Sequence, residues 1–135
     1  MDNIERDKIK KKRGRKGEDL ACEFLKKSGY RILERNFRCK MGEIDIVATD
    51  GEHICFTEVK ARTRTDYGMP RDAVDYRKQQ KLLRCAQLYL KLHPGLSRQF
   101  SPRMDIIEIL YREEGAYVRH TPGAFSLTQT GRNYG

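Results

Sequence analysis

Two short, strongly apolar segments of this chain, residues 43–49 and 53–60, stand on either side of Asp50-Gly51. An Asp-Gly pair between two such runs is one of the strongest short-range signals for a β-hairpin with a two-residue turn. Because side chains alternate between the two faces of a strand, the turn also fixes which residues of the two segments share a face. We therefore predict a hairpin here, within a sheet that the rest of the chain must cover.

Carboxylates gather at the open end of the predicted hairpin. With a two-residue turn, Glu43 pairs with Glu58, and Asp45 and Lys60 lie beside them on the same face. Lys60 can neutralise one of these charges but not three. A divalent cation would remove the repulsion, because Mg²⁺ and Mn²⁺ prefer carboxylate oxygens as ligands. We therefore predict a metal site that includes Glu43, Asp45 and Glu58.

The alternative is a solvated strand end at which the acids form salt bridges with basic neighbours. Arg38 lies in a predicted basic turn before the hairpin, and Arg62 and Arg64 follow Lys60 in a polar loop. Charged clusters are more often surface ion pairs than ligand sites. The same arginines are well placed to contact a phosphate backbone, and we predict that role for Arg38, Arg62 and Arg64.

The remaining patterns predict one mixed α/β domain, in which a mixed sheet carries helices on its faces. Residues 14–118 form this domain, between a flexible basic leader over residues 1–13 and a flexible tail over residues 119–135. The predicted elements are, in chain order, a helix over residues 14–28, strands over 30–37, 43–49 and 53–60, a helix from Pro70 to about Leu92, a strand over 104–111, and a short edge strand at 117–118.

A net charge of +9 on 135 residues favours a polyanionic partner, with nucleic acid ahead of a membrane surface. The alternative is that the charge only aids solubility. The chain shows no apolar run that could span a membrane and no signal-peptide pattern, so we expect a cytoplasmic protein without membrane contact. The cysteines are scattered without a CxxC pair, which argues against a zinc site or a disulfide framework. They are Cys22, Cys39, Cys55 and Cys85.

An Asp and a Glu-x-Lys on adjacent strands, after a helix with its own Glu, resemble the pattern of PD-(D/E)xK nucleases. Ile44 stands where that motif has its proline. The stretch from Gly14 to Ile109 resembles the YraN-type bacterial family more closely, and the wider likeness is to archaeal Holliday-junction resolvases. The segments that carry the resemblance are Gly17-Glu18, Arg35-Asn36-Phe37-Arg38, Gly42-Glu43-Ile44-Asp45, Phe56-Thr57-Glu58-Val59-Lys60, Gly68-Met69-Pro70, Lys78 and Asp105.

The resemblance implies a restriction-endonuclease-like fold and a role for each matching residue. Asp45 and Glu58 would bind Mg²⁺ or Mn²⁺ together with the backbone carbonyl of Val59. Glu18 would add a ligand from the first helix, directly or through water. Lys60 would position or activate the attacking water and stabilise charge that develops on the phosphate.

The function that follows is that of a Mg²⁺-dependent, endonuclease-like phosphodiesterase acting on DNA, with branched or structured DNA as candidate substrates. The resemblance also implies that Lys78 contacts a phosphate. A non-catalytic nucleic-acid-binding module with the same fold, and an accessory subunit that cuts only with a partner, are the alternatives. Three acids that face a polyanionic backbone favour the enzyme over the binding module, because a protein that only binds DNA has no need for them. A homodimer would suit cleavage of two strands, although no motif specifies one.

Overall fold

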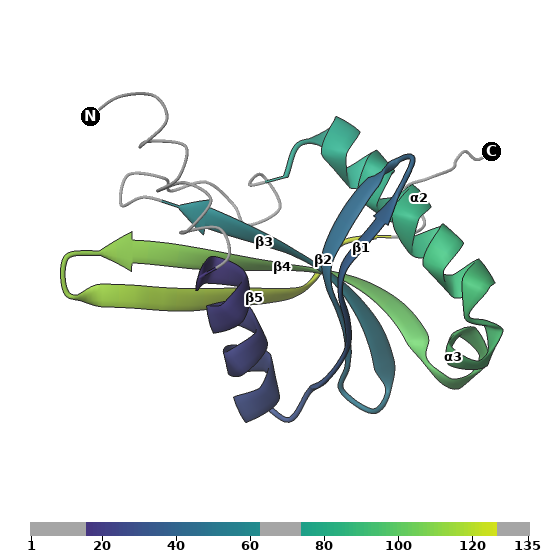
Figure 1. The fold of residues 1–135 in the computed structure, drawn as a ribbon, viewed down its shortest axis with the longest axis horizontal. Helices are drawn as coiled ribbons and strands as arrows, with labels where there is room; N and C mark the ends of the chain where they lie inside the picture. Colours follow the sequence, from purple (N-terminus) through teal and green to yellow (C-terminus); the bar gives the residue numbers. More distant parts are fainter. Residues whose placement is uncertain (1–15, 63–73, 127–135) are drawn as a thin grey trace.

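The computed structural model describes residues 16–62 and 74–126. These ranges form a mixed α/β structure around a five-stranded sheet in the order β1-β2-β3-β4-β5 (Figure 1). Neighbouring strands are antiparallel except for β3 and β4. None of the helices in these ranges is long and apolar enough to cross a membrane. The elements are a helix over residues 16–27 (the N-terminal helix), β1 (Arg31–Cys39), β2 (Gly42–Thr49), β3 (His53–Arg62), α2 (Tyr76–Leu92), α3 (Pro94–Gln99), β4 (Ser101–Arg112) and β5 (Gly115–Phe125).

The parallel pairing of β3 with β4 requires a crossover, because a tight turn can join only antiparallel neighbours. α2 and α3 lie in this crossover. α2 begins after Asp75, whose carboxylate accepts a hydrogen bond from the Lys78 amide at 2.8 Å and caps the helix. The prediction of a continuous helix from Pro70 was therefore wrong at residues 74–75, and Pro70 itself lies outside the described residues. The predicted end of the helix at His93 is confirmed.

Both faces of the sheet are buried, each by a different helix. One core packs against α2 and includes Ile44, Phe56 and Tyr89. The other packs against the N-terminal helix and includes Leu25 and Ile46. Ile44 and Ile46 are two residues apart in β2, where regular alternation predicts one shared face, yet they pack in different cores.

A backbone irregularity in β1 lies beside the place in β2 where the buried side chains change from one face of the sheet to the other. Asn36 has a φ of +57°, in the left-handed region. It lies between the pairs Arg35–Ile46 and Phe37–Ile44, and therefore opposite Asp45. The change of core between Ile44 and Ile46 in β2 thus coincides with a left-handed residue on the neighbouring strand.

The predicted hairpin forms, but its turn is longer than two residues. Thr49 pairs with Ile54, so four residues, 50–53, separate the paired positions. The Asp50 carboxylate accepts hydrogen bonds from the backbone N–H groups of Glu52 at 2.8 Å and His53 at 2.6 Å. An Asp side chain that bonds the backbone two and three residues ahead stabilises this wider turn.

The wider turn moves the pairing of β2 and β3 by two residues. Val47 pairs with Phe56, so the predicted pair Glu43–Glu58 was wrong. A shift by an even number keeps each side chain on its face of the strand. The acids therefore still face one another, but Asp45 takes the place next to Glu58 that the two-residue turn assigns to Glu43.

Two strands extend further than their sequence patterns predict. β1 continues through Cys39, so Arg38 lies in a strand and not in the predicted turn. β5 runs to Phe125, so residues 119–125 are not part of a flexible tail and the domain does not end at residue 118. Antiparallel pairing with β4, the preceding strand, holds this part of β5 in the sheet, as in the pairs Ile107–His120 and Met104–Phe125.

Candidate metal centre

Three carboxylates from two elements converge at the start of β2. Glu18 comes from the N-terminal helix, while Glu43 and Asp45 come from β2. One oxygen of each lies within 4.8 Å of one oxygen of the others. A divalent cation binds oxygen ligands at about 2.0–2.6 Å, so oxygens this close together could share one ion. The structure thus brings together three of the residues that the sequence analysis assigned to the metal.

Asp45 lies at the centre of the group and also contacts β3. Its Oδ2 accepts a hydrogen bond from the Val59 amide at 2.7 Å, just beyond the last regular pair, Ile46–Thr57. Burial, the charge of Glu58 and a hydrogen bond between the two carboxyls raise the pKa of Asp45 to about 9. Near neutral pH, the Asp45 carboxyl therefore keeps its proton in the absence of a cation.

Basic side chains surround the other acids of the group. Each of these acids has one basic partner, as the salt-bridge alternative predicts. The pairs are Arg35 with Glu18 at 3.5 Å, Arg38 with Glu43, and Lys78 with Glu58 at 3.4 Å. Asp45 forms no ion pair within residues 16–62 and 74–126. Four carboxylates thus face three basic groups, and the carboxyl without a base is the most central one.

The remaining predicted site residues lie near the end of β3. Lys60 is exposed and lies two residues beyond Glu58 on the same strand. Arg62 points to a buried acid, with its Nε 2.7 Å from Glu108. Arg64 lies outside the described residues. The structure therefore leaves Lys60 in solvent beside the acids and holds Arg62 in an ion pair.

Glu108 was missed by the sequence reasoning. It is fully buried in β4 and pairs with two arginines, Arg62 and Arg119, the latter at 2.8 and 3.0 Å. In the parallel register it lies next to Lys60. A lone acid in the apolar run 106–109 was the available signal, because a buried carboxylate needs a charged or hydrogen-bonding partner.

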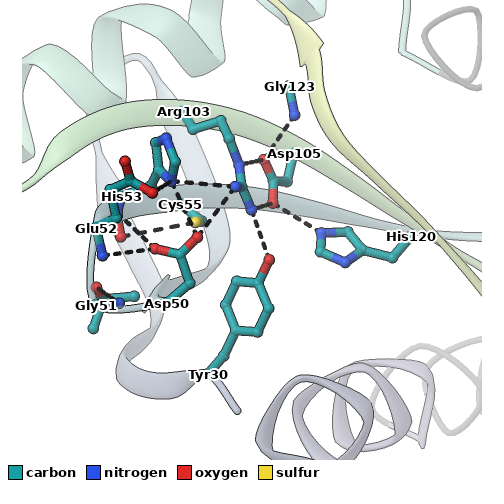
Figure 2. Close-up of polar contacts among 11 residues, drawn as sticks. Tyr30, Asp50, Gly51, Glu52, His53, Cys55, Arg103, Asp105, His120 and Gly123 are labelled. Carbon is teal, nitrogen blue, oxygen red and sulfur yellow. Dashed lines mark hydrogen bonds and ion pairs between the residues drawn. The ribbon is translucent and has the colours of Figure 1, made fainter. Parts of the chain in front are cut away.

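A second polar cluster lies at the opposite end of β2 and β3 (Figure 2). Its centre is the fully buried Asp105, which accepts hydrogen bonds from the Arg103 guanidinium at 2.8 and 2.9 Å and from the Gly123 amide at 3.0 Å. His120 hydrogen-bonds the same carboxylate at 2.8 Å, and Arg103 also donates to the Tyr30 hydroxyl at 2.8 Å.

These contacts decide the charge of Asp105. Burial alone would raise its pKa, but the hydrogen bonds from His120, Arg103 and the Gly123 amide outweigh it and hold the pKa below the usual value. Asp105 is thus a carboxylate with a full set of partners. The cluster has the character of a structural network and not of a ligand site.

The fold and the acidic group define a class: a mixed α/β domain with carboxylates that could hold a metal ion. The model of the uncharacterised protein family UPF0102, the YraN-like family, matches residues 17–109, and the chain belongs to this family.

Relatives with the same family name share about half of their aligned residues with this chain. A UPF0102 protein of Caldanaerobacter subterraneus subsp. tengcongensis is 47% identical over 105 residues, which cover 78% of this chain and 84% of that protein. One from Clostridium botulinum strain 657 is 49% identical over 94 residues, covering 70% and 76%. Among solved structures, Pyrococcus furiosus SfsA in complex with Ca²⁺ matches with a TM-score of 0.34 and 15% identity, covering 76% of this chain and 58% of that one.

Proposed function

We propose that this protein is a Mg²⁺- or Mn²⁺-dependent, endonuclease-like phosphodiesterase that acts on DNA, with the restriction-endonuclease-like arrangement that its motifs resemble. The observation that carries the proposal is the state of Asp45. This carboxyl hydrogen-bonds Glu58, and one of its oxygens lies within 4.8 Å of a carboxylate oxygen of Glu18 and of Glu43. It has no basic partner among the described residues. Acids arranged this way destabilise the fold unless a cation binds among them.

The donor set fits a hard divalent cation. Asp45, Glu58, Glu18 and Glu43 offer carboxylate oxygens, and the carbonyl of Val59 would add a backbone oxygen. The pKa of Asp45 is raised, as expected of a carboxyl that keeps its proton until a metal ion displaces it. When bound, the ion would act as a Lewis acid and lower the pKa of a coordinated water.

Lys60 would act on the water and the phosphate. Its exposed ammonium stands two residues beyond Glu58, where it can hold a water for attack and stabilise negative charge on a phosphoryl oxygen. Arg38 and Lys78 would contact neighbouring phosphates once a cation neutralises the acids that they pair with in this structure. Arg62 is held by the buried Glu108, so of the two arginines after Lys60 only Arg64 would add a further phosphate contact. The net charge of +9 suits a DNA partner.

The second candidate is a nucleic-acid-binding module without catalysis. The three ion pairs around Asp45 favour it, because among the described residues they leave one carboxyl of the group without a basic partner. On this reading the acids and bases stabilise the sheet end, and the remaining basic surface binds the phosphate backbone.

The test is a cleavage assay on labelled linear, nicked and four-way-junction DNA with Mg²⁺, Mn²⁺ or EDTA. The test protein is the Asp45→Asn/Glu58→Gln double variant, which keeps the shape of both side chains. The matched control is Glu23→Gln, an exposed acid on the N-terminal helix. We expect the wild type and the control to cleave with Mg²⁺ or Mn²⁺, and the double variant to lose at least about a hundredfold in rate.

The other outcomes separate the two candidates. Cleavage at equal rates by the wild type and the double variant would disprove the catalytic role of the acids. DNA binding by both proteins without cleavage by either, in any metal, would favour the binding module. Mn²⁺ titration by calorimetry gives a readout without DNA: heat of binding for the wild type and none for the double variant is expected.

A further inference from the structure

Two cysteines that are far apart in sequence meet beside the metal centre. Cys39 is the last residue of β1 and Cys85 lies in α2, 46 residues further along the chain. Their Sγ atoms are 2.9 Å apart. Both thiols are free. The other two cysteines, Cys22 and Cys55, are also free, and both are buried. A sequence without CxxC pairs does not predict this contact.

The distance between the two sulfurs is the first argument. Ordinary non-bonded contacts between heavy atoms lie at about 3.5–4.0 Å, while a disulfide bond is about 2.05 Å long. At 2.9 Å, the sulfurs of Cys39 and Cys85 are already closer than an ordinary contact. A movement of less than 1 Å would bring them to bonding distance.

The surroundings of the two thiols differ, and this sets an order of reaction. Cys39 is partly exposed, so a small oxidant can reach it, whereas Cys85 is buried. Burial, together with the hydrogen bond and the charge of Cys39, raises the pKa of Cys85 to about 12. Since the thiolate is the reactive form, the raised pKa slows the reaction of Cys85, and the partly exposed Cys39 reacts with an oxidant first.

We propose that Cys39 and Cys85 are a redox-active pair that closes to a disulfide and joins the end of β1 to α2. With hydrogen peroxide as the oxidant, the Cys39 thiolate attacks one peroxide oxygen, forms a sulfenic acid and releases hydroxide. The Cys85 sulfur then attacks the Cys39 sulfur, its proton leaves with the hydroxyl group as water, and the S–S bond forms. One peroxide is reduced, two thiols are oxidised, and a small dithiol reverses the step.

The bond would form directly beside the strand that carries part of the acidic group. Cys39 pairs with Gly42, and a Cβ added at Gly42 would lie 3.8 Å from the Cys85 sulfur and 3.9 Å from Lys81. Glu43 follows Gly42 in β2. The disulfide would thus fix the β1–β2 hairpin against α2 next to Glu43. This effect on the metal centre rests on the proposed function, but the formation of the disulfide does not.

The experiment uses the full chain, first reduced and desalted, then treated with a small excess of hydrogen peroxide. Free thiols are counted under denaturing conditions, and a non-reducing digest is mapped by mass spectrometry. We expect the count to fall from four to two and a crosslinked peptide to join Cys39 with Cys85. Cys39→Ser and Cys85→Ala should each prevent the crosslink. Cys22→Ala and Cys55→Ala, the matched controls, should keep it.

A thermal melt of the oxidised and reduced wild type gives a second readout that does not depend on any variant. Closing a loop of this length should raise the Tm by roughly 5–15 °C, and a reducing agent should abolish the gain. The proposal is overturned if peroxide leaves four thiols, joins two chains, or oxidises Cys39 to a sulfinic acid without a crosslink. Because neither readout needs metal or DNA, loss of the proposed nuclease activity would leave this result unaffected.

Discussion

The substitution Asp45→Asn should stabilise the metal-free protein increasingly as the pH rises. Asn keeps the size of the side chain and an oxygen that can accept the 2.7 Å hydrogen bond from the Val59 amide. What it removes is the ionisable group that lies buried against Glu58. If the variant is more stable than the wild type, the acid that it lacks serves binding and not folding.

The size of the expected change in the free energy of unfolding follows from the one proton that Asp45 binds in the fold. The pKa of Asp45 is raised to about 9 in the fold, whereas an Asp in the unfolded chain has a pKa of about 4. Between these values the folded state holds one proton more than the unfolded state, so stability falls as the pH rises. The slope is about 1.4 kcal/mol per pH unit. Relative to Asp45→Asn, the wild type should therefore lose about 4 kcal/mol between about pH 5 and pH 8.

The assay is urea unfolding in EDTA at several pH values across this range, with the free energy of unfolding of the wild type compared with that of Asp45→Asn. Glu23→Gln, which changes an exposed acid paired with Lys27, is the control and should follow the wild type at each pH. If the free energies of the wild type and Asp45→Asn run parallel from pH 5 to pH 8, then Asp45 is already ionised in the metal-free fold. The reasoning about its strained state would then be refuted.

Three further predictions concern metal binding and the buried ion pairs. Mn²⁺ should raise the Tm of the wild type more at pH 8 than at pH 6, because the ion displaces a proton from Asp45; a gain independent of pH would contradict this. Asp105→Asn should lower the free energy of unfolding by about 2–4 kcal/mol in urea, because Arg103 loses the nearer of its two charged partners, Asp105 and Asp50. Since the pKa of Asp105 is lowered, its contribution is present above about pH 4 and is lost as the pH falls further, so the variant should be less sensitive to acid than the wild type. Glu108→Gln should cost about 1–3 kcal/mol, since Arg62 and Arg119 both lose a carboxylate; a cost near zero would show that solvent replaces these ion pairs.

The elements of the fold were largely predictable, because they depend on local periodicity. The hairpin, the helix before it, the helix that ends at His93 and the strand around Ile107 all appear in the structure near their predicted positions. The turn was not predictable from Asp50-Gly51 alone. The Asp50 carboxylate bonds two backbone amides and widens the turn, and this competition between side chain and backbone is not visible in the dipeptide.

The structure brings three of the predicted acids together, whereas the predicted pairing of the strands was wrong. Glu18, Glu43 and Asp45 converge as the motifs imply, and the even register shift kept the acids together. Glu108 and the role of Arg62 were missed because both depend on the parallel pairing of β3 with β4. A contact made across a crossover leaves no periodic trace in either strand.

Two aspartates on different strands of the same sheet show what distinguishes the candidate metal centre from the rest of the polar interior. Asp105 has Arg103, His120 and the Gly123 amide as partners, and its pKa is lowered despite burial. Asp45 has one amide and a second carboxyl as neighbours, and its pKa is raised. The partners of Asp105 show that this sheet can supply a carboxylate with hydrogen-bond donors where the fold uses one for structure. Asp45 lacks this compensation among residues 16–62 and 74–126, and a divalent cation bound among Asp45 and its neighbouring acids would supply it.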